Sequence, residues 1–135
     1  MDIIDVAAAL VFRGGKLLIT QRPSGAHLEG LWEFPGGKRE PEESFEDCLV
    51  RELREELGIE VVVGHLIQTV VHRYPEKTVQ LKFFRCSWRE FEPRAIGCPA
   101  FVWVKPDELG AYTFPAADAV LLERLTGERD LWKMD

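Results

Sequence analysis

The alternation of apolar and polar residues divides the first part of the chain into short extended segments. A continuous apolar run from Val6 to Phe12 is followed, after Arg13-Gly14-Gly15, by a second run from Lys16 to Thr20. Two strand-like runs joined by a glycine-containing turn predict a β-hairpin. Leu31 to Phe34 alternates as a further short strand, which is expected to end at Pro35-Gly36-Gly37 because turn-forming residues follow.

The second half of the chain contains four more segments with a strand pattern. They are Ile59 to Val63 and Leu66 to His72, on either side of Gly64-His65, followed by Thr78 to Trp88 and Phe101 to Val104. The polar stretch from Arg89 to Pro99 contains prolines and is expected to form a loop.

One segment between these strands has the helical period instead. Its apolar stripe consists of Leu49, Leu53 and Leu57, which recur every four positions. Ser44 stands where an N-cap belongs, with Asp47 three residues later as the capping-box partner, and Gly58 suits the position just after the last turn. We therefore predict a helix between Ser44 and Gly58.

A second helix is predicted from Ala116 to Leu125, with Pro115 near its first position and Gly127 at its end. Strands outnumber helices, and their order is not a regular strand–helix alternation. This predicts an α+β fold in which two main helices pack against a mixed β-sheet. A length of 135 residues, 46% of them hydrophobic, suits a single domain over residues 1–135.

Composition restricts the partners. The net charge of −6 argues against binding to duplex nucleic acid, but not against a small polyanion that brings its own cations. No apolar run reaches the ~18 residues that cross a bilayer, and the N-terminus lacks the basic start of a secretory signal, so no membrane partner is expected. Cys48, Cys86 and Cys98 are too few and scattered for a zinc site or a disulfide framework, and are expected to be reduced thiols in a cytoplasmic protein.

Three acidic residues of the first predicted helix share one side. At 100° per residue, Glu52, Glu55 and Glu56 lie within an arc of about 100° beside the leucine stripe. Like charges at these spacings repel one another, so the stripe needs a counter-charge. Nearby arginines, Arg51 and Arg54, would serve. A hard divalent cation such as Mg²⁺, which prefers oxygen ligands, would serve as well.

The spacing around this helix resembles the signature of the Nudix hydrolases. Gly37 is followed by five residues and Glu43, then by seven residues and Arg51-Glu52-Leu53, one residue, Glu55-Glu56, one residue and Gly58-Ile59. The resemblance implies a Nudix-type α/β/α sandwich and a metal-dependent pyrophosphohydrolase. Its cofactor would be Mg²⁺, with Mn²⁺ as the alternative.

The resemblance also implies roles for individual residues. The expected metal ligands are the carbonyl of Gly36 and the carboxylates of Glu52, Glu55 and Glu56, and these three glutamates are the expected catalytic residues. Glu52 would bind metal or orient and deprotonate the attacking water. Glu43 and Arg51 would form a structural ion pair, and Gly37 and Gly58 would supply backbone freedom where a Cβ would clash.

Beyond this signature, "QRPSGAHLEGLWEFPGGK", "YPEKTVQLKFF" and "FPAADAV" are similar to the MutT branch of the family. That branch implies hydrolysis of a (d)NTP to a (d)NMP and diphosphate, including oxidised nucleotides such as 8-oxo-dGTP. The implied substrate-binding residues are Arg22, His27, Glu33, Phe34, Lys77 and Asp118. The expected partner is therefore a small nucleotide, and the expected state is a monomer or weak homodimer.

Three positions depart from the MutT pattern. Asp118 replaces an asparagine, and an ionised aspartate only accepts hydrogen bonds, so CTP or methyl-dCTP remains open as the substrate. Another nucleoside-diphosphate-linked compound, such as ADP-ribose or a dinucleoside polyphosphate, remains open as well. Asp118 would otherwise cap or solvate the last helix. Lys77 replaces an arginine. It would either contact the nucleotide through its single ammonium group, in place of a bidentate guanidinium, or be a solvated strand residue. Gly97 stands where the branch has an extra glutamate, so another carboxylate or Glu52 itself would be the base.

Two further classes of function stay open for comparison. One is a nucleotide-binding Nudix module without catalysis, which usually has an incomplete signature and an attached partner domain. The other is an interaction protein whose charged helix binds no ligand. The complete set of Glu52, Glu55 and Glu56 favours the enzyme.

Overall fold

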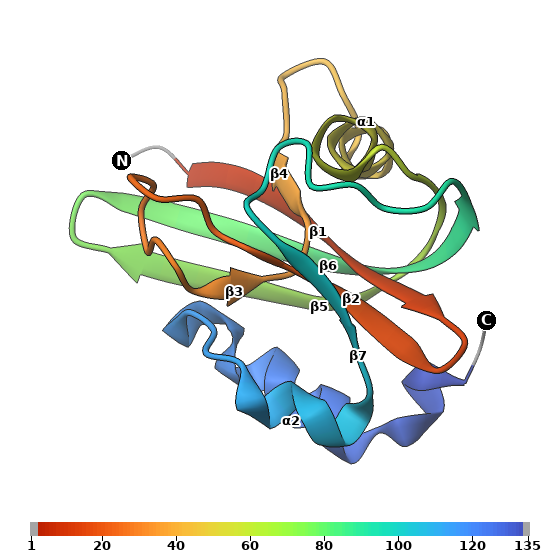
Figure 1. Cartoon of the computed structure of the whole chain (residues 1–135). Helices are drawn as coiled ribbons and strands as arrows, with labels where there is room; N and C mark the ends of the chain where they lie inside the picture. The colour runs from red at the N-terminus through yellow and green to blue at the C-terminus, as the bar shows by residue number, and fades with distance from the viewer. Residues whose placement is uncertain (1–2, 134–135) are drawn as a thin grey trace.

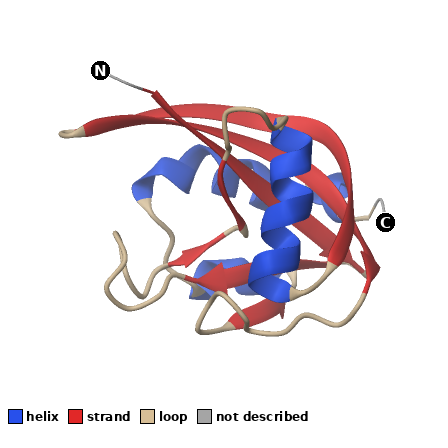
Figure 2. Ribbon diagram, turned by 90° about the horizontal axis from the view of Figure 1, so that it is seen from above, coloured by secondary structure: helices blue, strands red, loops and turns tan. Residues whose placement is uncertain are grey.

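The computed structural model describes residues 3–133, in which a mixed seven-stranded sheet is covered by helices on both faces (Figures 1 and 2). The strands are β1 (Ile3–Arg13), β2 (Lys16–Gln21), β3 (Trp32–Glu33), β4 (Gly36–Lys38), β5 (Glu60–Tyr74), β6 (Lys77–Glu90) and β7 (Phe101–Val104). The helices are α1 (Phe45–Leu57) and α2 (Ala119–Gly127), with the 3₁₀ turns η1 (Pro106–Ala111), η2 (Ala116–Asp118) and η3 (Arg129–Trp132). None of these helices is long and apolar enough to cross a membrane.

The sheet branches at β1 and at β2. The strand order is β3-β2-β1-β6-β5, with β4 also paired to β1 and β7 to β2. β1 runs parallel to β6, whereas its pairings with β2 and β4 are antiparallel. Gly36 of β4 lies opposite Ala8, and this pairing carries the chain from the sheet directly into the loop before α1.

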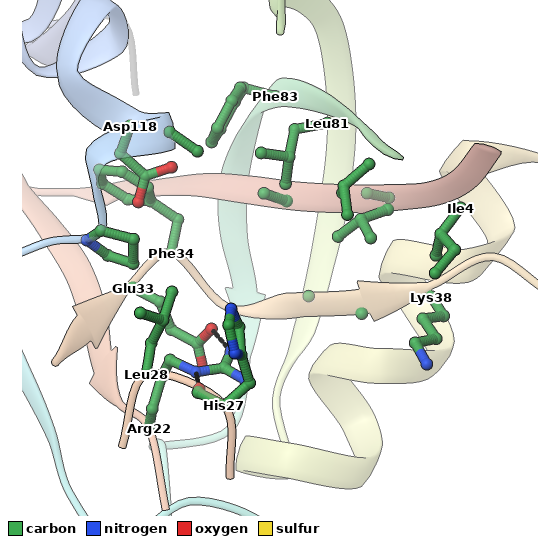
Figure 3. A pocket seen from close by; sticks show the side chains of 18 of the residues that line it. Ile4, Arg22, His27, Leu28, Glu33, Phe34, Lys38, Leu81, Phe83 and Asp118 are labelled. Atoms are coloured by element: carbon green, nitrogen blue, oxygen red, sulfur yellow. Dashed lines mark hydrogen bonds and ion pairs between the residues drawn. The ribbon is translucent and has the colours of Figure 1, made fainter. Parts of the chain in front are cut away.

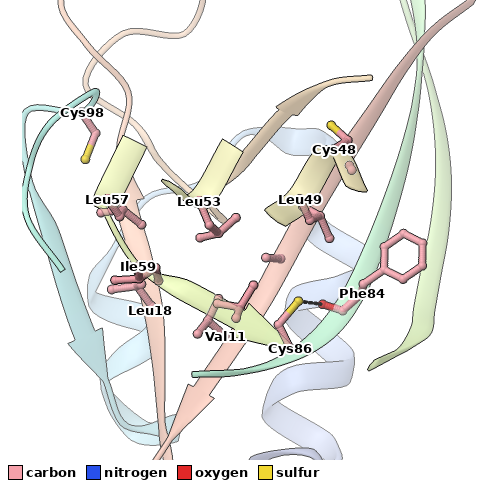
Figure 4. Close-up of a cluster of buried hydrophobic side chains, with 13 residues drawn as sticks. Val11, Leu18, Cys48, Leu49, Leu53, Leu57, Ile59, Phe84, Cys86 and Cys98 are labelled. Atoms are coloured by element: carbon pink, nitrogen blue, oxygen red, sulfur yellow. Dashed lines mark hydrogen bonds between the residues drawn. The ribbon is translucent and has the colours of Figure 1, made fainter. Parts of the chain in front are cut away.

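Two apolar layers hold the helices on the sheet. On one face, the leucine stripe of α1 packs on β1, β2, β5 and β6 (Figure 4). On the other face, Leu121 and Leu125 of α2 pack against residues of β1 that include Leu10 and Phe12. This arrangement confirms the expected α/β/α sandwich with two main helices. The three cysteines are free, buried thiols.

Both predicted ends of α1 are confirmed. The Ser44 side chain accepts a hydrogen bond from the backbone N–H of Asp47, and Gly58 adopts φ 67° just after the helix. The N–H of Gly58 donates to the carbonyl of Arg54. Such a left-handed residue satisfies carbonyls of the last turn, and glycine adopts it without the cost of a Cβ.

Other boundaries differ from the sequence-based prediction. The expected break at Gly64-His65 is wrong, because β5 continues through it with shifts of register against β6 between Val63 and Leu66 and between Leu66 and Gln68. A Cβ on Gly64 would lie 2.9 Å from the carbonyl oxygen of Arg85, so the glycine permits this irregular pairing.

The segment expected to end at the glycines also continues. Only Trp32 and Glu33 of the predicted 31–34 strand are extended in the sheet, and Gly36–Lys38 forms β4 instead of a turn. The second helix begins as the 3₁₀ turn η2, and its α-helical part runs from Ala119 to Gly127. β6 extends two residues into the predicted loop.

The α1 face of the core should be sensitive to truncation. Leu53 is fully buried between α1 and the sheet. We expect Leu53→Ala to lower the free energy of unfolding by about 2–5 kcal/mol, because it removes buried methyl groups and leaves a cavity. Urea unfolding followed by circular dichroism measures this. Val120→Ala, at a position that is 53% exposed, is the control and should change little; a similar loss for both variants would contradict the prediction.

Candidate active site

The three carboxylates on α1 occupy different environments. The Glu55 side chain is 55% exposed, whereas that of Glu52 is 19% exposed. Oε2 of Glu56 is buried and has no hydrogen-bond partner among residues 3–133. The shared stripe predicted from the helical period therefore contains one solvated carboxylate and two that face the protein.

An arginine supplies part of the counter-charge. Nε and Nη2 of Arg51 donate to the carboxylate of Glu43 at 2.9 and 2.6 Å. Nη1 lies 3.1 Å from an oxygen of Glu52 and of Glu55. The expected contact between Glu43 and Arg51 is present, and these hydrogen bonds lower the pKa of Glu43 to about 2. Arg54 contacts Glu60 instead of the stripe.

Among residues 3–133, no arginine forms an ion pair with Glu56. Burial, followed by the negative charges of Glu52 and Glu33, raises the pKa of the Glu56 carboxyl to about 9, although the backbone N–H of Gly36 donates to it. Burial also raises the pKa of Glu52, against the effect of Arg51. A buried carboxyl of this kind requires either a proton or a cation.

This unpartnered oxygen fits a hard divalent cation. Carboxylate oxygens are preferred ligands of Mg²⁺, which also keeps several waters. Within residues 3–133, no group of three or more histidine, cysteine, aspartate or glutamate side chains is already arranged to hold a metal ion. Glu55 pairs with Arg51, so this arginine would compete with a cation for the Glu55 carboxylate.

Two glycines bring β4 close to these carboxylates. A Cβ on Gly37 would lie 2.5 Å from the carboxylate of Glu52, and one on Gly36 would lie 2.0 Å from the carbonyl oxygen of Ala7. A side chain at either position would therefore displace the carboxylate or the strand. A Cβ on Gly58 would lie 2.9 Å from the end of the flexible Arg94 side chain, which can move aside, so the positive φ of 67° is the stronger reason for glycine at this position.

A cavity of about 290 Å³ lies beside this strand (Figure 3). All six predicted substrate-binding residues line it, namely Arg22, His27, Glu33, Phe34, Lys77 and Asp118. Gly36 and Gly37 line it too, whereas the three α1 glutamates do not. Because Gly36 contacts Glu56 and Gly37 abuts Glu52, the cavity and the carboxylates meet at β4.

Arg22 organises one rim of the cavity. Its Nε donates to the carbonyl of His27 at 2.5 Å, and its Nη1 lies 2.7 Å from Glu33 (Figure 3). Burial raises the pKa of Glu33 despite this ion pair. The His27 ring packs edge-on against Tyr74 of β5, at 5.2 Å between centroids. The loop that carries His27 therefore contacts the end of β5 at the edge of the cavity.

Asp118 lies across the cavity from Arg22 (Figure 3). It is only 7% exposed and its side chain makes no capping hydrogen bond, so the solvated or capping role considered for it is wrong. Burial first, and then the negative charge of Glu33, raise the pKa of Asp118 to about 7. At neutral pH, this carboxyl can therefore both donate and accept a hydrogen bond.

The remaining residues that line the cavity differ in how freely they could contact a bound molecule. Phe34 is buried and stacks on Phe114 at 5.0 Å, so that face of its ring is already covered. Nζ of Lys77 lies 5.7 Å from the Tyr74 ring centroid, at the tip of the β5–β6 hairpin. Lys38 and Leu28 line the cavity without having been predicted. The sequence feature that could have indicated Lys38 is its position, because it is a cationic residue directly after Gly36-Gly37.

Comparison with known proteins identifies the class. Residues 7–124 match the family model of the NUDIX domain, so the chain belongs to the Nudix family and is a hydrolase of pyrophosphate bonds. The CTP pyrophosphohydrolase of Escherichia coli K12 is 42% identical over 123 residues, which are 91% of each chain. The 8-oxo-dGTP diphosphatase of Haemophilus influenzae is 35% identical over 93% of each.

Solved structures agree with this assignment. The solution structure of the E. coli ORF135 protein superposes with a TM-score of 0.84 and 39% identity, over 100% of this chain and 96% of that one. Together with the 8-oxo-dGTP diphosphatases, the structural similarity to MutT proteins makes this chain a MutT-like Nudix hydrolase.

Proposed function

We propose that the protein hydrolyses nucleoside triphosphates to the monophosphate and diphosphate, with Mg²⁺ as its cation and Mn²⁺ as a substitute. The observation that carries this proposal is the junction at β4, where Gly36 both lines the cavity and contacts the buried carboxyl of Glu56. A nucleoside in the cavity therefore directs its phosphates toward the side of α1 that carries the glutamates.

The glutamates and one carbonyl would divide the chemical work. Glu55, Glu56, Glu52 and the carbonyl of Gly36 would hold the cation. When bound, Mg²⁺ neutralises phosphate charge and lowers the pKa of water. Glu52 is the best candidate base, because its carboxylate lies against Gly37 at the edge of the cavity. Gly97 offers no carboxylate, and its backbone N–H donates to the Glu56 carbonyl.

Asp118 is the proposed reader of the base edge. When ionised, it only accepts hydrogen bonds, which suits either the N1–H or the N7–H donor of 8-oxoguanine but not the O6 acceptor that lies between them. When neutral, it offers one donor and one acceptor, which suit N3 and the amino group of cytosine. The pKa of about 7 makes both forms accessible. This observation, and the similarity to a CTP pyrophosphohydrolase, favour CTP or methyl-dCTP as the second candidate beside 8-oxo-dGTP.

A substrate panel tests the proposal. Purified protein with Mg²⁺ is incubated with 8-oxo-dGTP, dGTP, CTP, methyl-dCTP and ADP-ribose, and the products are separated by ion-exchange chromatography. We expect diphosphate and a monophosphate from at least one triphosphate. Binding without turnover would favour a non-catalytic module. No diphosphate from any triphosphate would refute the proposed activity.

Asp118→Asn tests base recognition. An amide cannot ionise and has a fixed donor and acceptor, so the ranking of substrates should change. We expect the ratio of kcat/KM for 8-oxo-dGTP over CTP to rise by about tenfold or more, because an amide can donate to O6 and accept from N7–H of 8-oxoguanine, the MutT branch has asparagine here, and buried polar contacts discriminate strongly. Asp107→Asn is the control, because the Asp107 side chain is 82% exposed. An unchanged ranking would remove Asp118 from base recognition.

A further inference from the structure

The loop between β6 and β7 is bonded to the last turn of α1. The backbone N–H groups of Ile96 and Gly97 both donate to the carbonyl of Glu56, at 3.1 and 3.0 Å. The N–H of Arg94 donates to the carbonyl of Leu57 at 2.9 Å. Figure 1 shows this loop passing beside α1 on its way to β7. Carbonyls of the last helical turn have no partner within the helix, so the loop supplies one.

The approach of this loop is close. A Cβ on Gly97 would lie 3.2 Å from Cα of Glu56, which leaves little space for any side chain at position 97. The backbone of Glu56 is therefore held from outside the helix by residues 96 and 97. Its side-chain oxygen Oε2 is buried and has no hydrogen-bond partner among residues 3–133.

The other end of the loop is fixed to the sheet by Arg13. Nη1 and Nη2 of Arg13, at the end of β1, lie 3.1 and 2.8 Å from the Glu92 carboxylate. The same guanidinium lies 3.6 Å from the ring centroid of Trp88 on β6. Trp88 in turn donates from Nε1 to the carbonyl of Phe91 at 2.7 Å. Arg13 thus connects β1, β6 and the start of the loop.

We infer that residues 91–97 form a backbone clamp that sets the position of Glu56, and that Arg13 is a positioning residue for the cation site. This inference rests on the proposed role of Glu56 as a cation ligand. Arg13 touches neither the cavity nor the α1 carboxylates, so it acts through Glu92 and the loop. Groups that orient a metal ligand change metal affinity without contacting the metal.

Two variants and a control test the clamp. Arg13→Leu removes the contacts with Glu92 and Trp88, and Gly97→Ala places a Cβ 3.2 Å from Cα of Glu56, so that the loop or the helix has to shift by a few tenths of an ångström. Arg129→Leu is the control, because it also removes an exposed arginine, whose partner is Asp107. The first readout is amide hydrogen exchange at Ile96 and Gly97 by NMR. The second is the Mn²⁺ dissociation constant, measured from the free Mn²⁺ signal in electron paramagnetic resonance.

We expect faster exchange at both amides and Mn²⁺ binding about tenfold weaker in the two test variants, with wild-type values in the control. Arg13→Lys should recover part of the affinity, since it retains a charge for Glu92. With substrate, kcat should fall while KM stays unchanged. Wild-type Mn²⁺ affinity in both test variants would overturn the clamp alone. A wild-type protein that binds no Mn²⁺ would overturn the cation role of Glu56 and the clamp with it.

Discussion

Glu56→Gln should greatly reduce turnover and at the same time stabilise the cation-free protein. The substitution keeps the shape of the side chain but removes the charge that a cation needs, so we expect kcat/KM to fall by about a thousandfold, or about 4 kcal/mol of transition-state stabilisation. Stability should rise near neutral pH, because a buried carboxyl with no partner for Oε2 no longer has to be protonated. Diphosphate release and thermal unfolding in chelator measure the two effects.

The stabilising effect should depend on pH in a defined direction. The pKa of Glu56 is about 9 in the folded protein and 4.5 as the reference, so the folded state binds the extra proton between these values. The stability that this proton provides is fully present below the lower value and is lost as pH rises through the higher one. Glu56→Gln should remove this part of the slope, while the raised pKa of Glu52 keeps another part.

Two other glutamates provide controls. Glu55→Gln should reduce turnover without stabilising the cation-free protein, because Glu55 is exposed and paired with Arg51. Glu46→Gln, on the exposed first turn of α1, should change neither. Near-wild-type turnover in Glu56→Gln would remove this carboxylate from catalysis, and a loss of stability in that variant would contradict the account of its burial.

Gly36→Ala should have the largest effect on folding. Its Cβ would lie 2.0 Å from the carbonyl oxygen of Ala7, within the pairing of β4 with β1. Backbone atoms cannot move aside as a side chain can, so we expect a loss of about 3 kcal/mol or more in the free energy of unfolding. The N–H of Gly36 that reaches Glu56 would be displaced as well, and turnover should be lost in whatever fraction folds.

Urea unfolding of Gly36→Ala and Gly110→Ala compares a crowded glycine with an open one. A Cβ on Gly110 would have no neighbour within 4 Å, so this control should remain within about 0.5 kcal/mol of wild type. Equal stability of the two variants would show that β4 does not pack against β1 as closely as described.

Local sequence determined the elements whose signals are short in range. Ser44 and Gly58 mark the two ends of α1 because capping requires only residues within one turn of the helix. The turn Arg13-Gly14-Gly15 and its flanking apolar runs determine the β1–β2 hairpin for the same reason. The helical period alone places Glu52, Glu55 and Glu56 on one side of α1.

Elements that depend on distant partners were predicted incorrectly. Nothing near Gly36 indicates that it will pair with Ala8, which lies almost thirty positions earlier, so the local sequence predicts a turn where β4 forms. The irregular pairing at Gly64 is accommodated only because β6 lies alongside β5 over its whole length. Sheet pairing is decided by the strand that lies opposite, and that information is not local.

The site shows the same division. The glutamates, Arg22, Glu33 and Asp118 could be proposed from the chain, because their residue types and spacing resemble a known pattern. Their unequal states could not, since Glu56 acquires its raised pKa from burial and from the charges of Glu52 and Glu33, and Asp118 acquires its raised pKa from burial and from the charge of Glu33. Sequence by itself determined which carboxylates share one side of the helix. Tertiary structure decided which of these carboxylates are buried from water and which are paired with an arginine, because desolvation and charge depend on neighbours that only folding brings together.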